Sequence, residues 1–391
     1  MVRALAHATR PGAALRIALL FRSYGPYHLA RLKALRKDHT VLAIEWSPVD
    51  GDYGWEESEK KREAGVIAPS RNELAAKLAE FSTEAVAIPG YSEPFALGAL
   101  RSCNKLGMLA VLMSDTHAGS IRGNTGRETL KRQLVALYRS ALVAGKPHVE
   151  YLTSLGFPSK RIVTGYDVVD NRHFSTHAAG SAPKNDGLPK TYFFCCARFV
   201  AKKNLQFLVE AFAQYRREHL RDAWDLVIAG DGPLRDAVAR HASELSVGPN
   251  VHILGHRSYA ELPDLYAAAG AFILPSVVDE WGLVVNEAMA TGLPVLVSKG
   301  AGCHRDLVDI GVNGFVFDPA NVGELAGLMA RIATSTRRNE MGAASRRIIA
   351  DWDVDCFAKG LAAAVDIARS PRVPKRFHIG SAVAAALSFA R

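Results

Sequence analysis

Short apolar runs alternate along the chain with segments in which apolar residues recur at helical spacing. In the first half, five such runs predict β-strands at residues 15–21, 41–46, 85–88, 108–113 and 141–144. The segments between them predict helices at 27–36, 73–80 and 128–139. Because strands that alternate with helices are typical of a parallel sheet covered by helices, we expect an α/β, doubly wound domain.

A polar stretch rich in Gly and Pro at 175–190 interrupts this alternation and predicts an interdomain linker. The alternation then restarts, with strands expected at 191–196, 226–229, 251–254, 271–274 and 294–298. Helices are expected at 205–212, 234–245 and 260–268 and from about residue 283. The pattern therefore predicts a second doubly wound domain.

Length and composition agree with two globular domains. The 391 residues are 49% hydrophobic and 22% charged, which excludes a wholly disordered, collagenous or coiled-coil chain. The five cysteines are odd in number and lack CxxC spacing, a pattern that favours a reducing cytosol. No signal peptide and no run of roughly 18 apolar residues is found, so we expect a cytoplasmic protein that does not span a membrane.

The net charge of +9 is unevenly distributed. Residues 1–180 hold 24 Lys and Arg against 17 Asp and Glu, whereas residues 181–391 hold 24 against 22. This excess favours a negatively charged partner for the first half, such as a phosphate or a phospholipid surface, or else a solvated basic surface. Because no RNA-binding or zinc-finger signature accompanies it, nucleic acid is not the expected partner.

Ligands of open α/β sheets bind at the carboxyl ends of the strands, so the loops after the predicted strands are the candidate sites. The loop after the first strand contains Gly25, which permits close backbone approach. Arg198 and Lys203 follow the first strand of the second half, and this pair could bind a diphosphate and stabilise it as a leaving group. The turn from Gly230 to Gly232 is a candidate phosphate loop but lacks the dinucleotide-binding GxGxxG pattern.

The loop after the strand at 271–274 is the most informative. A helix that starts near Gly282 directs its N-terminal N–H groups toward this loop, where a phosphate or sugar oxygens could bind. Asp279 precedes the helix and Glu287 lies about one turn inside it, so two carboxylates flank one pocket mouth. No His, Cys or carboxylate cluster with metal-ligand spacing stands out in these loops, so no metal is expected.

These motifs resemble the retaining glycosyltransferases of family 4, most strongly over residues 191–330. The family's Arg-x4-Lys pair falls on Arg198 and Lys203, and its Glu-x7-Glu element falls on Asp279 and Glu287. The resemblance implies the GT-B fold of two facing Rossmann-like domains. Residues 1–178 would bind the acceptor, with a C-terminal helix at 353–369 packed back on them, and residues 190–352 would bind the nucleotide-sugar donor.

The resemblance also implies roles for individual residues. Arg198 and Lys203 would contact the donor diphosphate, and Glu287 would bind the ribose hydroxyls. The first acidic position is filled by Asp279 or by its neighbour Glu280, and the position of a family His near the reacting sugar is filled by Asp115 or His117. The remaining implied donor contacts are Trp281, Gly282, Leu283, Gly230, Gly232 and Gly25.

The implied function is transfer of a sugar, with retention and without a metal or other cofactor, from a UDP- or GDP-linked donor to a hydroxyl acceptor. The first-half basicity and the basic, partly apolar end at 369–391 favour a lipid-linked saccharide acceptor and contact with the inner face of the cell membrane. The alternatives are a soluble acceptor, a GT-B epimerase or phosphorylase, and a nucleotide-sugar-binding protein without catalytic activity.

Overall fold

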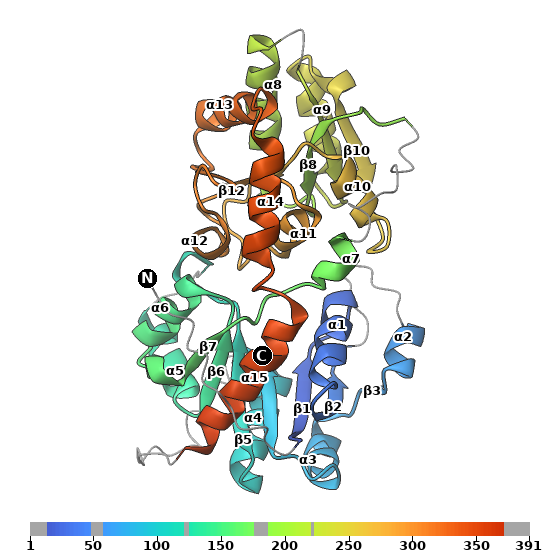
Figure 1. The fold of residues 1–391 in the computed structure, drawn as a ribbon. Coiled ribbons are helices and arrows are strands. Elements are labelled where there is room, and N and C mark those ends of the chain that lie inside the picture. Colours follow the sequence, from blue (N-terminus) through green and yellow to red (C-terminus); the bar gives the residue numbers. More distant parts are fainter. Residues whose placement is uncertain (1–13, 48–57, 121–124, 176–186, 220–222, 371–391) are drawn as a thin grey trace.

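The computed structural model describes residues 14–47, 58–120, 125–175, 187–219 and 223–370. These residues form two parallel β-sheets flanked by helices, one domain above the other in Figure 1. The doubly wound architecture expected from the alternating pattern is confirmed. None of the helices within the described ranges is long and apolar enough to cross a lipid bilayer.

The first domain holds a seven-stranded sheet in the order β3-β2-β1-β4-β5-β6-β7. Its strands are β1 (Arg16–Phe21), β2 (Thr40–Glu45), β3 (Val66–Ile67), β4 (Ala85–Pro89), β5 (Leu109–Ser114), β6 (Ser140–Val143) and β7 (Ile162–Thr164). The accompanying helices are α1 (Pro26–Leu35), α2 (Ser58–Glu63), α3 (Arg71–Glu80), α4 (Pro94–Leu106), α5 (Thr125–Val135), α6 (Lys146–Ser154) and α7 (Asn171–Ser175).

The second domain holds a six-stranded sheet in the order β10-β9-β8-β11-β12-β13. Its strands are β8 (Tyr192–Cys196), β9 (Asp225–Ala229), β10 (Val251–Gly255), β11 (Ala271–Leu274), β12 (Val295–Ser298) and β13 (Gly314–Phe317). The helices are α8 (Leu205–Glu218), α9 (Arg235–Glu244), α10 (Leu262–Ala268), α11 (Leu283–Thr291), α12 (His304–Leu307), α13 (Val322–Ala333) and α14 (Arg338–Ile349), followed by α15 (Val354–Arg369).

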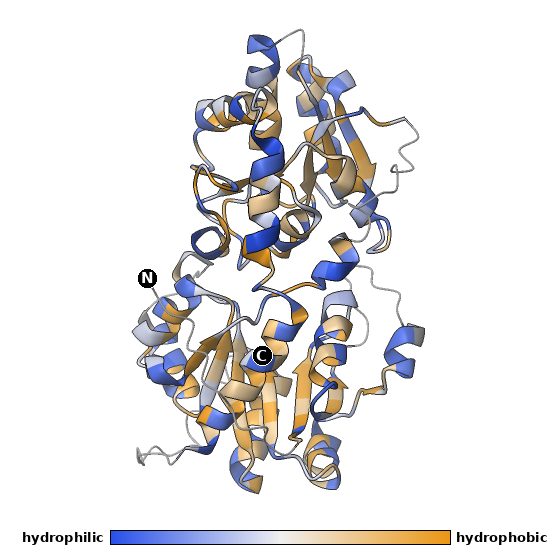
Figure 2. Cartoon of the chain, viewed as in Figure 1, coloured by the Kyte–Doolittle hydropathy of each residue, from blue (hydrophilic) through white to orange (hydrophobic). Residues whose placement is uncertain are grey.

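Both faces of the first sheet are buried, which explains why its central strands are continuous apolar runs. Along β1, Ala18 and Leu20 pack in the core that includes α3 and α4, while Ile17 and Leu19 pack in the core that includes α1 and α15. Figure 2 shows the same arrangement, with hydrophobic strands enclosed by helices that carry the hydrophilic residues. The strand order reverses between β1 and β4, so right-handed crossovers place helices on opposite faces.

The prediction for the helix at 128–139 was wrong at both ends. The helix α5 covers Thr125–Val135, and the chain turns over the next residues. The backbone N–H of Arg139 donates to Ala110 O at 2.9 Å, which draws the chain into the sheet before the helical spacing ends. Ala141, which continues that spacing in the sequence, therefore lies in β6.

The helix α15 belongs to the first domain although it ends the described chain. It packs against α1, β5 and β6, and the hydroxyl of buried Ser140 donates to Ala364 O at 2.6 Å. Where the chain passes between the domains, the backbones of Val169 and Asp353 form an isolated parallel β-bridge. The side-chain amide of Asn171 donates to Ile349 O at 2.8 Å. The chain therefore passes between the domains at two adjacent places.

Two sequence expectations cannot be followed in the structure. Most of the linker at 175–190 and nearly all of the basic end at 369–391 lie outside the described residues.

We expect Leu361→Ala to lower the free energy of unfolding by about 2–5 kcal/mol, because it leaves a cavity where α15 meets the first sheet. Leu361 is fully buried in that core. Urea unfolding measures the effect, and Lys359→Ala, on the exposed side of the same helix, is the control. Equal effects of the two substitutions would contradict the packing of α15 described above.

Candidate active site

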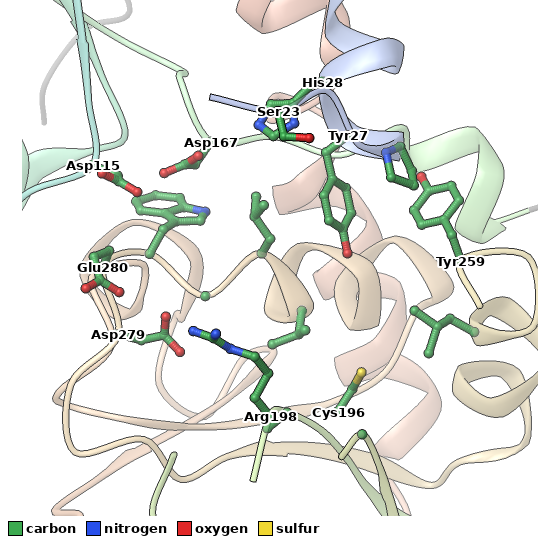
Figure 3. A pocket seen from close by; sticks show the side chains of 18 of the residues that line it. Ser23, Tyr27, His28, Asp115, Asp167, Cys196, Arg198, Tyr259, Asp279 and Glu280 are labelled. Atoms are coloured by element: carbon green, nitrogen blue, oxygen red, sulfur yellow. The ribbon is translucent and has the colours of Figure 1, made fainter. Parts of the chain in front are cut away.

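A cavity of about 1230 Å³ lies between the two domains. Residues at the ends of β1, β4, β5 and β7 line it from the first domain, and residues at the ends of β8, β9, β10 and β11 line it from the second. Ligands of open α/β sheets bind outside the carboxyl ends of the strands, so both sheets present their binding edges to this cleft. Figure 3 shows the side chains that line it.

The structure brings Arg198, Lys203 and Asp279 together. Arg198 follows β8 and points toward Asp279 in Figure 3. The ammonium of Lys203 forms a short hydrogen bond and ion pair with Oδ2 of Asp279, and the hydroxyl of Ser276 donates to the same oxygen at 3.1 Å. Two cations predicted to bind a diphosphate thus line the cavity beside the first acidic position.

The loop between β11 and α11, which we call the acidic loop (residues 275–282), is held by two histidines of the first domain. Nε2 of His117 lies 3.0 Å from the carbonyl of Asp279, and Nε2 of His148 lies 2.9 Å from the carbonyl of Glu280. In each ring, Nδ1 accepts a backbone N–H, from Gly119 and Gly145 respectively. Both rings must therefore carry their proton on Nε2 and donate it to the acidic loop.

This arrangement separates the two candidates for the reacting centre. Asp115 lines the cavity, whereas His117 is not among the lining residues and uses both ring nitrogens to hold the backbone. His148 was not predicted, and no spacing in the sequence singles it out. Burial lowers its pKa from 6.5 to about 4, so it stays neutral near pH 7.

The residues after Glu280 join the acidic loop to the helix α11. The indole N–H of buried Trp281 donates to Oδ1 of Asn286 at 2.9 Å, and its ring packs against His148 and Trp352. Gly282 adopts φ 103° at the helix N-cap, a conformation that favours glycine. Trp281, Gly282 and Leu283 all line the cavity, next to the N-terminus of α11.

Glu287 is fully buried, and both of its oxygens are already hydrogen-bonded to tyrosines. The hydroxyl of Tyr27, from α1 of the first domain, donates to Oε1 at 2.5 Å, and that of Tyr266, from α10, donates to Oε2 at 2.6 Å. Burial raises the pKa of Glu287 to about 7, against the opposing effect of the two hydrogen bonds. Sequence reasoning singled out Glu287 but not its two partners.

The predicted glycines contribute backbone shape. Gly230 has φ 133°, and a Cβ there would lie 2.0 Å from the carbonyl oxygen of Ala197, so only glycine fits against the turn after β8. Gly232 has φ 151° and packs in the same way against Phe199. Gly230 lines the cavity, whereas Gly25 is the N-cap of α1, beside the lining residues Pro26 and Tyr27.

Two aspartates of the first domain also face the cleft (Figure 3). Burial and the charge of Asp115 raise the pKa of Asp167 to about 7, and burial together with Glu280 raises that of Asp115. Arg31, which is buried, donates to Val168 O at 3.0 Å and contacts Oδ1 of Asp167 at 3.3 Å. Within the described part of the chain, no three His, Cys, Asp or Glu side chains converge to hold a metal ion.

Residues 181–348 match a protein-family model described as group 1 glycosyl transferases. A GDP-mannose-dependent alpha-(1-6)-phosphatidylinositol monomannoside mannosyltransferase of Mycobacterium tuberculosis is 32% identical over 177 residues, covering 43% of this chain and 45% of the relative. An uncharacterised glycosyltransferase of Methanocaldococcus jannaschii is 33% identical over 135 residues, or 34% of each chain. The chain thus spans between about a third and a half of the length of these curated relatives.

A solved structure covers nearly the whole chain. HepE of Anabaena, in complex with UDP, superposes with a TM-score of 0.73 at 18% identity, covering 90% of this chain and 100% of HepE. The described residues therefore adopt the GT-B fold, with two Rossmann-like domains that face a cleft. The match over residues 181–348 confirms the resemblance of the second domain to group 1 glycosyltransferases.

The low pKa of His148 predicts a stability effect at acidic pH. Because the unfolded chain binds a proton near pH 6.5 and the folded chain only near pH 4, the stability that His148 contributes is complete above pH 6.5. It declines as the pH falls toward 4, by roughly 3 kcal/mol in total.

Urea unfolding of the native chain and of His148→Asn between pH 7.5 and pH 4.5 measures this effect. The advantage of the native chain should shrink as the pH falls. The control is His256→Asn, which alters an exposed histidine. A constant gap for His148→Asn would show that the histidine is not held neutral by burial.

Proposed function

We propose that the chain is a retaining glycosyltransferase that transfers a sugar from a UDP- or GDP-linked donor to a hydroxyl acceptor. The convergence of Arg198, Lys203 and Asp279 at the cleft, before the N-terminus of α11, carries this proposal. The family match of the second domain supports it, as do the UDP in the HepE structure and the GDP-mannose dependence of the mycobacterial relative.

The chemistry follows from these positions. The bond between the anomeric carbon and the diphosphate oxygen breaks, and Arg198 and Lys203 stabilise the negative charge on the departing nucleotide. The acceptor hydroxyl attacks from the face that the leaving group vacates, and an oxygen of the departing phosphate takes its proton. The configuration is thereby retained, and no metal is needed for the charge because two cations line the site.

For the acceptor, we propose a lipid-linked saccharide at the inner face of the cell membrane. The mycobacterial relative is named for its action on a phosphatidylinositol monomannoside. The excess of basic residues in the first 180 positions is compatible with an anionic lipid surface.

The proposal is tested by thermal-shift measurements with UDP- and GDP-sugars, followed by transfer assays with the donor that stabilises the protein. Lipid-linked and soluble saccharides serve as alternative acceptors, and the anomeric configuration of the product is determined. Activity should persist in excess EDTA. Release of free sugar or sugar phosphate without transfer would instead indicate an epimerase or phosphorylase, and donor binding without turnover a binding protein.

Arg198→Ala should lower kcat by about 10²–10³-fold, because the arginine acts on the charge that develops on the leaving group. The dissociation constant of the donor should change much less. Steady-state kinetics and donor titration separate the two quantities. Arg240→Ala, which removes an exposed arginine of α9 in the same domain, is the control. Unchanged turnover in Arg198→Ala would rule out this role.

Tyr27→Phe should strengthen donor binding by roughly 3–10-fold. The Tyr27 hydroxyl is hydrogen-bonded to the carboxylate of Glu287, which would bind the ribose, so the donor must displace it. A hydrogen bond to a charged group contributes about 1.5–3 kcal/mol, and the new bond to the ribose recovers part of this free energy.

Isothermal titration with UDP or GDP measures the change. Tyr24→Phe is the matched control, because its hydroxyl bonds to Leu19 O inside the first domain and does not reach Glu287. Weaker binding to Tyr27→Phe would mean that Tyr27 itself contacts the donor and does not compete with it.

A further inference from the structure

Four carboxylates lie together along one side of the cleft, and we call this group the acidic end. Asp115 follows β5, Asp167 follows β7, and the acidic loop supplies Asp279 and Glu280. All four line the cavity, and Figure 3 shows them on the side away from Tyr27 and Tyr259. Residues from both domains thus contribute to one acidic surface.

The cations around the acidic end do not satisfy all of these carboxylates. Asp279 pairs with Lys203, and Glu280 pairs with Lys202 at 2.8 Å. Both partners come from the same short segment of the second domain. Lys203 is one of the two cations that would bind the donor diphosphate, so a bound donor draws positive charge away from Asp279.

The two first-domain carboxylates have less support. Arg31 directs its Nε and Nη2 atoms to Val168 O at 3.2 and 3.0 Å and reaches Oδ1 of Asp167 only at 3.3 Å. None of the described side chains forms a hydrogen bond or ion pair with the carboxylate of Asp115. The pair therefore holds two carboxyl groups against one arginine.

Oδ2 of Asp167 is the independent sign of a missing ligand. The side chain of Asp167 is only 8% exposed and lines the cavity, yet Oδ2 has no hydrogen-bond partner among the described residues. A buried acceptor without a donor costs roughly 1–3 kcal/mol, and such atoms are rare in folded proteins. A donor group on a ligand in the cleft would remove this cost.

The geometry points to a protonated amino group, carried by one of the two sugars, as the ligand of the acidic end. This inference rests on the proposed glycosyl transfer and specifies its substrate class. An ammonium offers three donors and a positive charge, which matches the unsatisfied oxygen of Asp167 and the neighbouring carboxyl group of Asp115. A neutral hydroxyl would supply a donor but would leave the repulsion between the carboxylates in place.

The electrostatics of the empty cleft agree with this choice. The pKa of Asp167 is raised to about 7 by burial and by the neighbouring Asp115, despite the opposing charge of Arg31. Burial and Glu280 likewise raise the pKa of Asp115. An ammonium between these groups would stabilise their ionised forms. A metal ion fits less well, because the described side chains present no set of three ligands that converge on one point.

The amino group could belong to the acceptor or to the sugar of the donor, and two binding series distinguish these sources. In the first, glucosamine, N-acetylglucosamine and glucose are titrated into the full-length protein saturated with UDP. In the second, UDP-glucosamine, UDP-N-acetylglucosamine and UDP-glucose are titrated into the free protein. In the series that contains the true source of the amino group, the free amine should bind at least about tenfold more tightly than the acetylated and hydroxyl forms.

Asp167→Asn and Asp115→Asn should each reduce this preference to about threefold or less, while the shift in Tm produced by UDP stays unchanged. Glu93→Gln is the matched control, because Glu93 lines the same cavity outside the acidic end and should leave the preference intact. Two independent variants protect the test against a folding defect in either one.

The absence of any preference for the amine in both series, with UDP still raising the Tm, would overturn this inference and leave the proposed function standing. A preference that survives both substitutions would also overturn it. If neither UDP nor GDP raises the Tm and no sugar transfer occurs, the proposed function itself fails. The two failures are therefore distinguishable.

Discussion

The geometry of the cleft depends on two imidazoles that hold the acidic loop by its backbone. His117 and His148 reach across from the first domain to consecutive carbonyls of the second, at Asp279 and Glu280. Each ring can donate from Nε2 only because its Nδ1 is occupied by a backbone N–H. The backbone N–H groups of the first domain thus fix the proton on the nitrogen that faces the loop.

Holding the backbone leaves the side chains of the loop available to the cleft. Asp279 and Glu280 extend toward the cavity and meet Lys203 and Lys202, whereas Trp281 fills the interface with its ring. The same region anchors the first domain in return: the carboxylate of Asp306 accepts the N–H of Lys146 at the start of α6 at 2.9 Å. The domains are thus joined by directional polar contacts as well as by apolar packing, in which Ala144 and Val169 of the first domain meet Trp281 of the second.

The sequence predicted those strands, helices and loops that depend on local patterns of apolar and polar residues. Central strands such as β8 and β11 are continuous apolar runs because both their faces are buried, and the cation pair and Gly282 lie in the loops that follow them. The edge strands β3 and β7 were missed, since they are two and three residues long and only half-buried and so leave no periodic signal. The strand β13 was also missed, because it is only four residues long and directly follows a turn.

The unpredicted part of the site consists of contacts between distant residues. The Tyr27–Glu287 bond spans 260 positions, and the bonds of His117 and His148 to the loop span 162 and 132. No spacing rule links such residues, because their proximity is created by the packing of two sheets that different parts of the chain form. For the same reason, the acidic loop could be located from its own residues while the side chains that hold it could not.

The net charge of the first half of the chain likewise does not predict which charged side chains face the cleft. The first 180 residues have an excess of seven positive charges, yet the first-domain side of the cleft presents Asp115 and Asp167, with Arg31 largely committed to a carbonyl. An overall positive charge acts at long range and governs which surfaces the protein approaches. The groups that a substrate touches are instead set by a few buried side chains, whose low-dielectric surroundings strengthen each local charge. A net positive charge over the first half of the chain and an acidic side of the cleft are therefore compatible, because the two act over different distances.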